Sequence, residues 1–181
     1  MNDGFDFLRR ANDGNSAAVI ANPVTQEFQM VRCNLLSGLL KTIKENRGVA
    51  IPIKVFEVSD VVLLDEKNET GAKNSRRVAA LIYANSPHFE DIQGLFDYIM
   101  KQLGVTRFRK SDPQEQRDTG YYITESNDPA FFGALGAADV YCYGKRIGVY
   151  GVVHPEVLQN YGLKLPCGAL ELDIEFFVPG N

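Results

Sequence analysis

Two histidines are the side chains of this sequence whose position could support catalysis. His88 and His154 each stand at the start of an expected helix, and His154 directly precedes Pro155. A hydrolytic reaction with His154 as general base, assisted by Glu156, would need a Ser or Cys nucleophile in a recognisable setting such as Gly-x-Ser-x-Gly, and none occurs. We therefore interpret His154 as a helix-entry residue that hydrogen-bonds its own turn, and we assign no catalytic residue.

Three acids near the end of the chain alternate with apolar residues. Glu171, Asp173 and Glu175 share one register of an expected strand, where carboxylate oxygens could hold a divalent cation. The same period of two is typical of a strand with one face in water. We favour that second interpretation, so the acids are expected to point outward and no metal site is predicted.

Basic residues gather at two places in expected loops. Arg76 and Arg77 form one pair, and Arg107, Arg109 and Lys110 form a second group around an aromatic residue that could stack on a base. Such clusters more often only solvate the end of a loop. RNA contact through Arg107, Arg109 and Lys110 therefore remains an alternative function.

The composition predicts one globular domain. At 181 residues and 45% hydrophobic content, the chain is long enough to bury about two-thirds of the surface that its unfolded form exposes. The net charge of -4 opposes a role in coating a nucleic acid duplex, which requires local positive charge, so no DNA partner is expected. No apolar run approaches the roughly 18 to 20 residues of a membrane span, and no membrane association is expected.

Cysteine usage and glycine motifs exclude several classes of site. Cys33, Cys142 and Cys167 are odd in number and never form a Cys-x-x-Cys pair, which supports neither a disulfide framework nor a zinc site. They are expected to be small apolar residues of a protein in the reducing cytosol. Neither Gly-x-Gly-x-x-Gly nor Gly-x4-Gly-Lys-Ser/Thr occurs, so no cofactor or nucleotide site is predicted.

The elements that would position these residues are organised around residues 22–65. A helix over residues 34–46 is predicted from an apolar stripe made of Leu35, Leu36, Leu39, Leu40 and Ile43. The strand predicted at 53–64 is apolar in both of its registers, which is typical of a central strand covered on both faces. The stripe fits either a core or a subunit interface, because obligate interfaces resemble cores.

The remaining pattern mixes hairpins and helices without regular alternation, which predicts an α+β fold with an antiparallel sheet and helices on one side of it. Residues 1–16 are expected to be a flexible lead-in and residues 17–181 one domain. The expected strands are 17–21, 78–84, 121–124, 139–143, 147–153 and 170–176; helices are expected from Ser86 to Gly104 and from His154 to Gly162, and loops at 65–75 and 107–120.

Several long blocks resemble a known family. The blocks are NPVTQEFQMVRCNLLSGLLKTIKENR, PIKVFEVSDVV, GLFDYIMKQLG, IGVYGVVHPEVLQNYGLKLPC and LELDIEFFV. In this order they resemble the C-terminal part of the β subunit of phenylalanyl-tRNA synthetase, of the archaeal and eukaryotic cytosolic type. The resemblance covers nearly the whole chain after the first dozen or so residues.

The resemblance implies a class II aminoacyl-tRNA synthetase-like fold, an antiparallel sheet flanked by helices. In this family the β subunit's version of that domain is a catalytic-like module without an active site. The α subunit activates phenylalanine with ATP and Mg²⁺ and transfers it to tRNA(Phe) in an (αβ)₂ assembly in the cytoplasm. The chain is accordingly expected to be a fragment of a longer β subunit that has no cofactor of its own.

Individual residues agree with a loss of catalysis. Class II synthetases carry an arginine on the strand of their second motif to hold the α-phosphate of ATP, and the matching place here is near Leu63, with Asp60 three residues before it. A leucine cannot neutralise phosphate charge, and an aspartate would oppose it. The third motif, which closes on an arginine, is also missing, since the sequence ends LELDIEFFVPGN.

The chain departs from the family at two places. Ser37 stands where the family usually has a proline before the glycine of the apolar helix, so we expect a straighter helix. Residues 131–139 lack the Pro-Gly-Arg element that the family tends to show.

Partner contact is expected from the helix at 34–46, the hairpin at 53–84 and the segment 147–163, with self-association left open. The residues proposed for this contact are Leu35, Leu36, Leu39, Leu40, Ile43, Phe56, His154 and Pro155. The alternative is a free-standing RNA-binding or protein-interaction module of the same fold.

Overall fold

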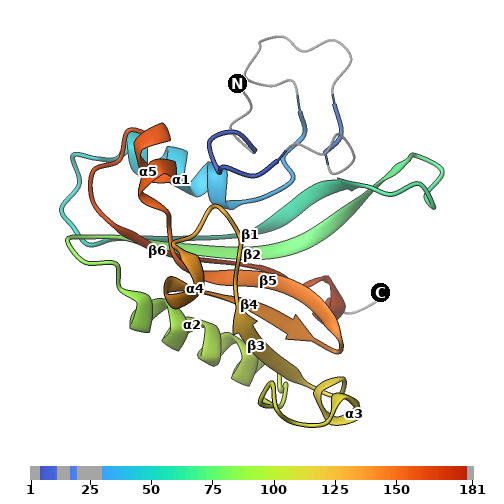
Figure 1. Cartoon of the computed structure of the whole chain (residues 1–181). Coiled ribbons are helices and arrows are strands. Elements are labelled where there is room, and N and C mark those ends of the chain that lie inside the picture. The colour runs from blue at the N-terminus through green and yellow to red at the C-terminus, as the bar shows by residue number, and fades with distance from the viewer. Residues whose placement is uncertain (1–4, 12–16, 20–29, 179–181) are drawn as a thin grey trace.

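The computed structural model describes residues 5–11, 17–19 and 30–178. Six strands form one antiparallel sheet in the order β1-β2-β6-β5-β4-β3 (Figure 1). The strands are β1 Ile53–Leu64, β2 Ala72–Tyr83, β3 Tyr121–Glu125, β4 Ala137–Cys142, β5 Lys145–Val152 and β6 Cys167–Asp173. The helices are α1 Leu36–Glu45, α2 Phe89–Gln102, α3 Gln114–Arg117, α4 Gly133–Gly136 and α5 Pro155–Asn160, followed by a 3₁₀ turn at Glu175–Phe177. The expected α+β class and antiparallel sheet are confirmed.

Helices cover both faces of the sheet, whereas we expected them on one side. Figure 1 shows α1 and α5 above the sheet and α2 below it. The apolar stripe of α1 is buried as predicted and packs with Val61 and Leu81 of the sheet. On the opposite face Phe96 of α2 stacks on Tyr150 of β5, with ring centroids 4.8 Å apart. Alternate residues of each strand therefore point into two separate cores, one on each face of the sheet.

The strand β1 lies at an edge of the sheet, so the prediction of a central strand covered on both faces is wrong. One register faces α1, as shown by the complete burial of Val61. The other register carries Phe56 and Val58, which are 76% and 53% exposed. An apolar sequence pattern indicates that a strand favours cover on both faces, but it does not say that the same chain provides that cover.

The strand β6 lies at the centre, between β2 and β5, so the prediction of a strand with one wet face is also wrong. Its acid Glu171 is only 4% exposed. Two other boundaries differ from expectation. The strand β2 begins at Ala72, inside the expected charged loop, and extends the hairpin to the register Leu64↔Ala72. The described part of the expected lead-in, residues 5–11, is a turn with Phe5 and Leu8 buried, while residues 12–16 and 20–21 lie outside the described residues.

The close approach of β5 to β6 generates a prediction for Gly148. A Cβ atom at this position would overlap the backbone carbonyl oxygen of Glu171 and come within 2.9 Å of Leu172 Cα. Gly148→Ala should therefore lower the free energy of unfolding by about 1–3 kcal/mol, the usual cost of overpacking. Chemical denaturation measures it.

The matched control is Gly38→Ala in α1, where a Cβ meets no atom within 4 Å. It should raise the stability by up to about 1 kcal/mol, since alanine favours a helix over glycine. Equal effects of the two variants would contradict the packing described here.

Candidate functional site

The structure distributes the residues proposed for partner contact between the core and the surface. The five stripe residues Leu35, Leu36, Leu39, Leu40 and Ile43 are all buried within this chain. Their side chains contact the sheet of the same domain, and they offer no surface to a partner as the chain stands. Phe56, at the edge of the sheet, and Pro155, in the first turn of α5, are exposed.

The proposed RNA-contact residues lie between α2 and β3. Arg109 and Lys110 are exposed. The Nη1 atom of Arg107 lies 3.7 Å from the Asp97 carboxylate, and the backbone N–H of Arg109 donates to the Asp112 carboxylate at 2.7 Å. Two acids thus accompany the cations, which weakens the local positive potential that RNA would require.

The position that the resemblance assigns to a second motif carries no cation. Leu63 is partly buried and packs against the core on the α1 face. The Asp60 carboxylate accepts two hydrogen bonds from the Arg76 guanidinium, which hold the pKa of that carboxyl below its usual value. Neither residue presents a positive charge to a ligand.

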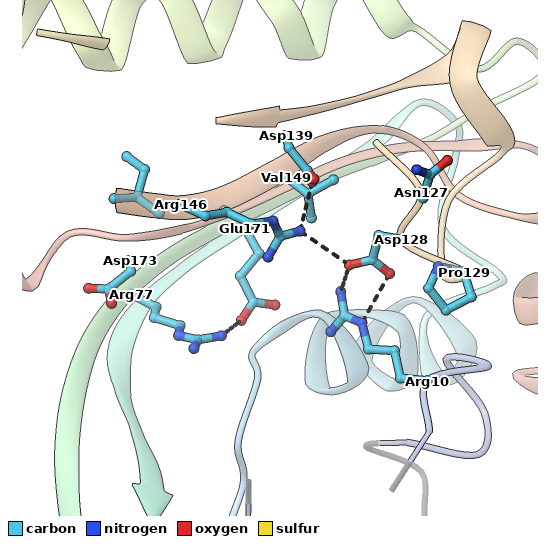
Figure 2. Close-up of a pocket in the computed structure, with 12 residues that line it drawn as sticks. Arg10, Arg77, Asn127, Asp128, Pro129, Asp139, Arg146, Val149, Glu171 and Asp173 are labelled. Carbon is cyan, nitrogen blue, oxygen red and sulfur yellow. Dashed lines mark hydrogen bonds and ion pairs between the residues drawn. The ribbon is translucent and has the colours of Figure 1, made fainter. Parts of the chain in front are cut away.

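One pocket of the structure has a volume of about 490 Å³ and lies over β2, β6, β5 and β4 on the α1 face (Figure 2). Its charged lining consists of the guanidinium groups of Arg10, Arg77 and Arg146 and the carboxylates of Asp128, Asp139, Glu171 and Asp173. The sequence analysis missed this cluster as a site. Only Arg77 and the last two acids had been singled out.

Glu171 is the most deeply buried acid of the pocket. One carboxylate oxygen accepts a hydrogen bond from Arg77 Nη1 at 2.8 Å, and the other accepts the backbone N–H of Leu36 at 3.0 Å. Leu36 is the first residue of α1, so the carboxylate also meets the positive end of the helix dipole. Asn34 caps the same end by accepting the N–H of Ser37 at 3.1 Å. Glu171 therefore connects the centre of the sheet to the start of α1.

Asp128 ties the N-terminal turn to the loop before α4. Its two carboxylate oxygens accept hydrogen bonds from Arg10 Nε and Nη2 at 3.1 and 2.8 Å. Burial opposes the charge on Arg10, but the attraction of Asp128 outweighs it and the pKa of Arg10 lies above its usual value. Figure 2 shows Arg10 and Arg146 approaching Asp128 from two sides.

Arg146 bonds mainly to a strand neighbour. Its Nη2 donates to the Asp139 carboxylate at 2.7 Å, and the Ser126 hydroxyl donates to the same oxygen at 2.7 Å. Each of the three guanidinium groups in the pocket is thus engaged by a carboxylate of the chain. Within these three guanidinium groups, the buried Arg77 Nε has no hydrogen-bond partner among the described residues.

This arrangement does not favour nucleotide binding. The pocket has one more carboxylate than guanidinium groups, and its cations are already paired, so a triphosphate would meet net negative charge. Within the described residues no group of three or more His, Cys, Asp and Glu side chains is placed to hold a metal ion. The network is suited to holding segments together.

The cysteine thiols are held in their unreactive, protonated form. Burial raises the pKa of the Cys142 thiol to about 11 and that of the Cys167 thiol to about 12, so both are protonated at neutral pH. Burial also raises the pKa of Cys33.

His154 caps α5, as the sequence analysis predicted. Its Nδ1 accepts the backbone N–H of Glu156 at 3.2 Å. The Glu156 carboxylate lies 2.9 Å from Arg9 Nε, so the proposed acid partner of a hydrolytic His154 is engaged in an ion pair. Partial burial and the nearby Arg9 charge lower the pKa of His154.

Two of the carboxylates that form ion pairs with arginine, one buried and one partly exposed, allow a direct comparison. Glu171→Ala leaves Arg77 and the Leu36 N–H without their acceptor in the interior, and we expect a loss of about 3–5 kcal/mol in the free energy of unfolding. The control Glu57→Ala removes the partly exposed pair with Arg32, whose atoms are 2.8 Å apart, and should cost less than about 1 kcal/mol. Urea denaturation of both variants measures the difference. Similar losses would mean that burial does not strengthen the first pair.

The cap at His154 predicts a dependence of stability on pH. Because the folded state lowers its pKa, the neutral form is the one that stabilises the fold: its contribution is present above about pH 6.5, the usual value, and is lost as the pH falls through the lowered pKa. His154→Asn retains a cap acceptor that does not titrate in this range. The stability of the wild-type chain should therefore fall more than that of the variant between about pH 7 and 5 in thermal unfolding. Parallel curves would exclude this cap as the cause.

No helix among the described residues is long and apolar enough to cross a membrane.

Comparisons with known proteins agree with the resemblance seen in the sequence. Residues 2–174 match the family model described as the phenylalanyl tRNA synthetase beta chain CLM domain. The chain is 41% identical over 171 residues to the phenylalanine--tRNA ligase beta subunit of Caenorhabditis elegans, which covers 94% of this chain and 28% of the relative. It is 42% identical over 162 residues to the Homo sapiens protein of the same name, with 90% and 26% covered. A relative from Arabidopsis thaliana, named as cytoplasmic, is 43% identical over 176 residues, with 96% and 29% covered.

The chain thus spans between about a quarter and a third of the length of these relatives. Because the family model matches almost all of its residues, the chain belongs to the family of phenylalanyl-tRNA synthetase beta chain CLM domains.

Proposed function

We propose that this chain is a non-catalytic structural domain of a phenylalanine–tRNA ligase β subunit. In this proposal it has the architecture of a class II synthetase catalytic domain without its chemistry. The α subunit activates phenylalanine with ATP and Mg²⁺ and transfers it to tRNA(Phe), and the present domain supports the α subunit within an (αβ)₂ assembly in the cytoplasm. The names of the relatives, which are ligase beta subunits, support a role in such a complex.

The observation that carries the proposal is the internal pairing of the pocket. A site that activates an amino acid with ATP must present free cations to phosphate groups as charge develops on them. Here Arg10 and Arg77 are each occupied by a carboxylate of the chain, and Leu63 replaces the expected arginine of the second motif. In this proposal the chain has the sheet of such a domain, but its arginines bind carboxylates of the same chain.

Among the proposed contact residues, those at the start of α5 are best placed to meet a partner. Pro155 is exposed, and beside it the ring of Phe132, 57% exposed, lies 6.0 Å from the ring of His154. An exposed aromatic side chain beside a rigid helix start is a common anchor of protein interfaces. We assign contact with the α subunit to this end of the domain.

The alternative function is an RNA-binding module that uses Arg107, Arg109 and Lys110. The exposure of Arg109 and Lys110 favours it, while the pairing of Arg107 with Asp97 opposes it. Salt-dependent binding of tRNA by the chain alone, lost in the double variant Arg107→Ala and Arg109→Ala, would support this alternative.

The proposed function predicts an inactive chain that binds a subunit. Incubated with ATP, Mg²⁺ and phenylalanine, the chain alone should give no pyrophosphate exchange above the buffer blank, whereas a complete ligase assayed in parallel should exchange. Co-expressed with a matching α subunit, it should co-purify in a complex whose mass is measured directly. Robust exchange by the chain alone would overturn the proposal.

The contact surface has its own variant and control. Phe132→Ser should reduce co-purification with the α subunit by about tenfold or more, which corresponds to the loss of an aromatic anchor. Tyr98→Ser on α2, an aromatic residue of similar exposure (60%), should leave it unchanged. An equal loss in both variants would place the contact elsewhere.

A further inference from the structure

The outer edge of β1 is not covered by any described residue over a short stretch. The Val62 N–H donates to the Arg32 carbonyl, and Arg32 Nε donates to the Asp60 carbonyl, so the backbone groups of even-numbered residues point away from β2. The pairing of β1 with β2 runs without a bulge from residue 53 to residue 64. The backbone groups of Lys54, Phe56 and Val58 therefore face the same outer edge. No described residue bonds them there.

The two ends of this open edge are fixed. Beyond Val58 the segment at Arg32 occupies the edge, since it bonds Asp60 and Val62. Before Lys54 stands Pro52, which has no N–H to donate. A strand that pairs with β1 here can therefore bond three of its residues, Lys54, Phe56 and Val58. It cannot continue past Val58, because Arg32 occupies the edge there.

The side chains of the open edge form an apolar patch. Phe56 is 76% exposed and Val58 53% exposed, and with Lys54 they lie on the face opposite α1. α2 covers β2, β5 and β6 on that face, and its contacts with β1 are few or absent. A free edge with exposed apolar residues is the usual template for the addition of another strand.

We propose that the occupant of this edge is a second copy of the chain, paired antiparallel through β1 about a two-fold axis at Phe56. This register sets Phe56 opposite its own copy and Lys54 opposite the partner's Val58, so that all three edge-facing residues of each chain form hydrogen bonds. The two sheets become one continuous sheet. Self-pairing of this kind is the closed, isologous arrangement that most dimers adopt.

Charge complementarity favours this register. Diagonal neighbours across a strand pair lie within reach of a long side chain, and the partner's Lys54 is diagonal to Asp60. The Asp60 carboxylate is partly exposed on the same face, beside Arg76. Moving the axis by one residue to Glu57 would set Lys54 opposite the partner's Asp60, whose carbonyl oxygen already accepts from Arg32, and would oppose two Glu57 carboxylates. Moving the axis to Val55 would bring Pro52 into the pairing, and a hydrogen bond would be lost because proline has no N–H to donate.

The patch is small for a permanent interface, so the dimer is expected to dissociate in the micromolar range. Sedimentation velocity of the chain from about 1 to 200 μM should show a reversible shift from the mass of one chain to that of two. A single species with the mass of one chain across this range would overturn the proposal.

A charged variant tests the surface. Val58→Lys places a lysine opposite the partner's Lys54 and should weaken the dimer at least tenfold. Tyr98→Lys is the matched control, because Tyr98 adjoins Asp97, which pairs with Arg107 beside β3 at the opposite edge of the sheet. Circular dichroism and thermal unfolding of both variants show whether the fold is retained. A dimer unaffected by Val58→Lys would overturn the proposal.

A cross-link tests the register independently of variant stability. Residues directly opposite in a hydrogen-bonded antiparallel pair have Cα atoms about 5.5 Å apart, which a disulfide can span. Phe56→Cys should therefore form a covalent dimer under mild oxidation, whereas Tyr98→Cys and the wild-type chain, with its own Cys33, should not. If a Phe56→Cys chain cross-links only to a Val58→Cys chain, the two strands pair in another register. If it cross-links only to the α subunit, that subunit occupies the edge. Either result would overturn the proposal.

Discussion

The buried carboxylate of Glu171 is the contact on which the arrangement of the domain depends. It reaches from the central strand β6 to a guanidinium on β2 and to the first N–H of α1. Removing an ionised carboxylate from water is unfavourable, and it is tolerated here because two charge-assisted partners meet it. The position of α1 over the sheet is thereby set by a polar contact as well as by its apolar stripe.

The pocket around Glu171 shows how charged groups of both signs are held together over the sheet. Two of its three arginines are held by an acid that comes from a distant part of the sequence. Arg10 and Asp128 are separated by 118 positions, and Arg77 and Glu171 by 94. Such pairs contribute to the specificity of the fold, because a shift of either segment would leave a charge buried alone.

Local patterns in the sequence predicted the helices and strands well, but they predicted poorly which elements pack beside one another. The leucine stripe predicted α1, and Pro155 with His154 before it predicted the start of α5, since each signal lies within a few residues of its effect. Whether β1 is central depends on strands that pair with it, and Phe56 is apolar whether or not this chain covers it. Glu171 was expected to point outward, because the alternation of apolar and acidic residues carries no information on a guanidinium 94 residues away. The pairing of Arg10 could not be foreseen for the same reason.

The central position of β6 in the sheet has a consequence for how the domain folds during its synthesis on the ribosome. The hairpin β1-β2 and the meander β3-β4-β5 are each made of neighbours in sequence, and both can form as soon as they are synthesised. They become one sheet only when β6, the last strand, inserts between them. Until then each half presents an unpaired edge to the surroundings, so the nascent chain passes through a stage in which it needs protection from aggregation.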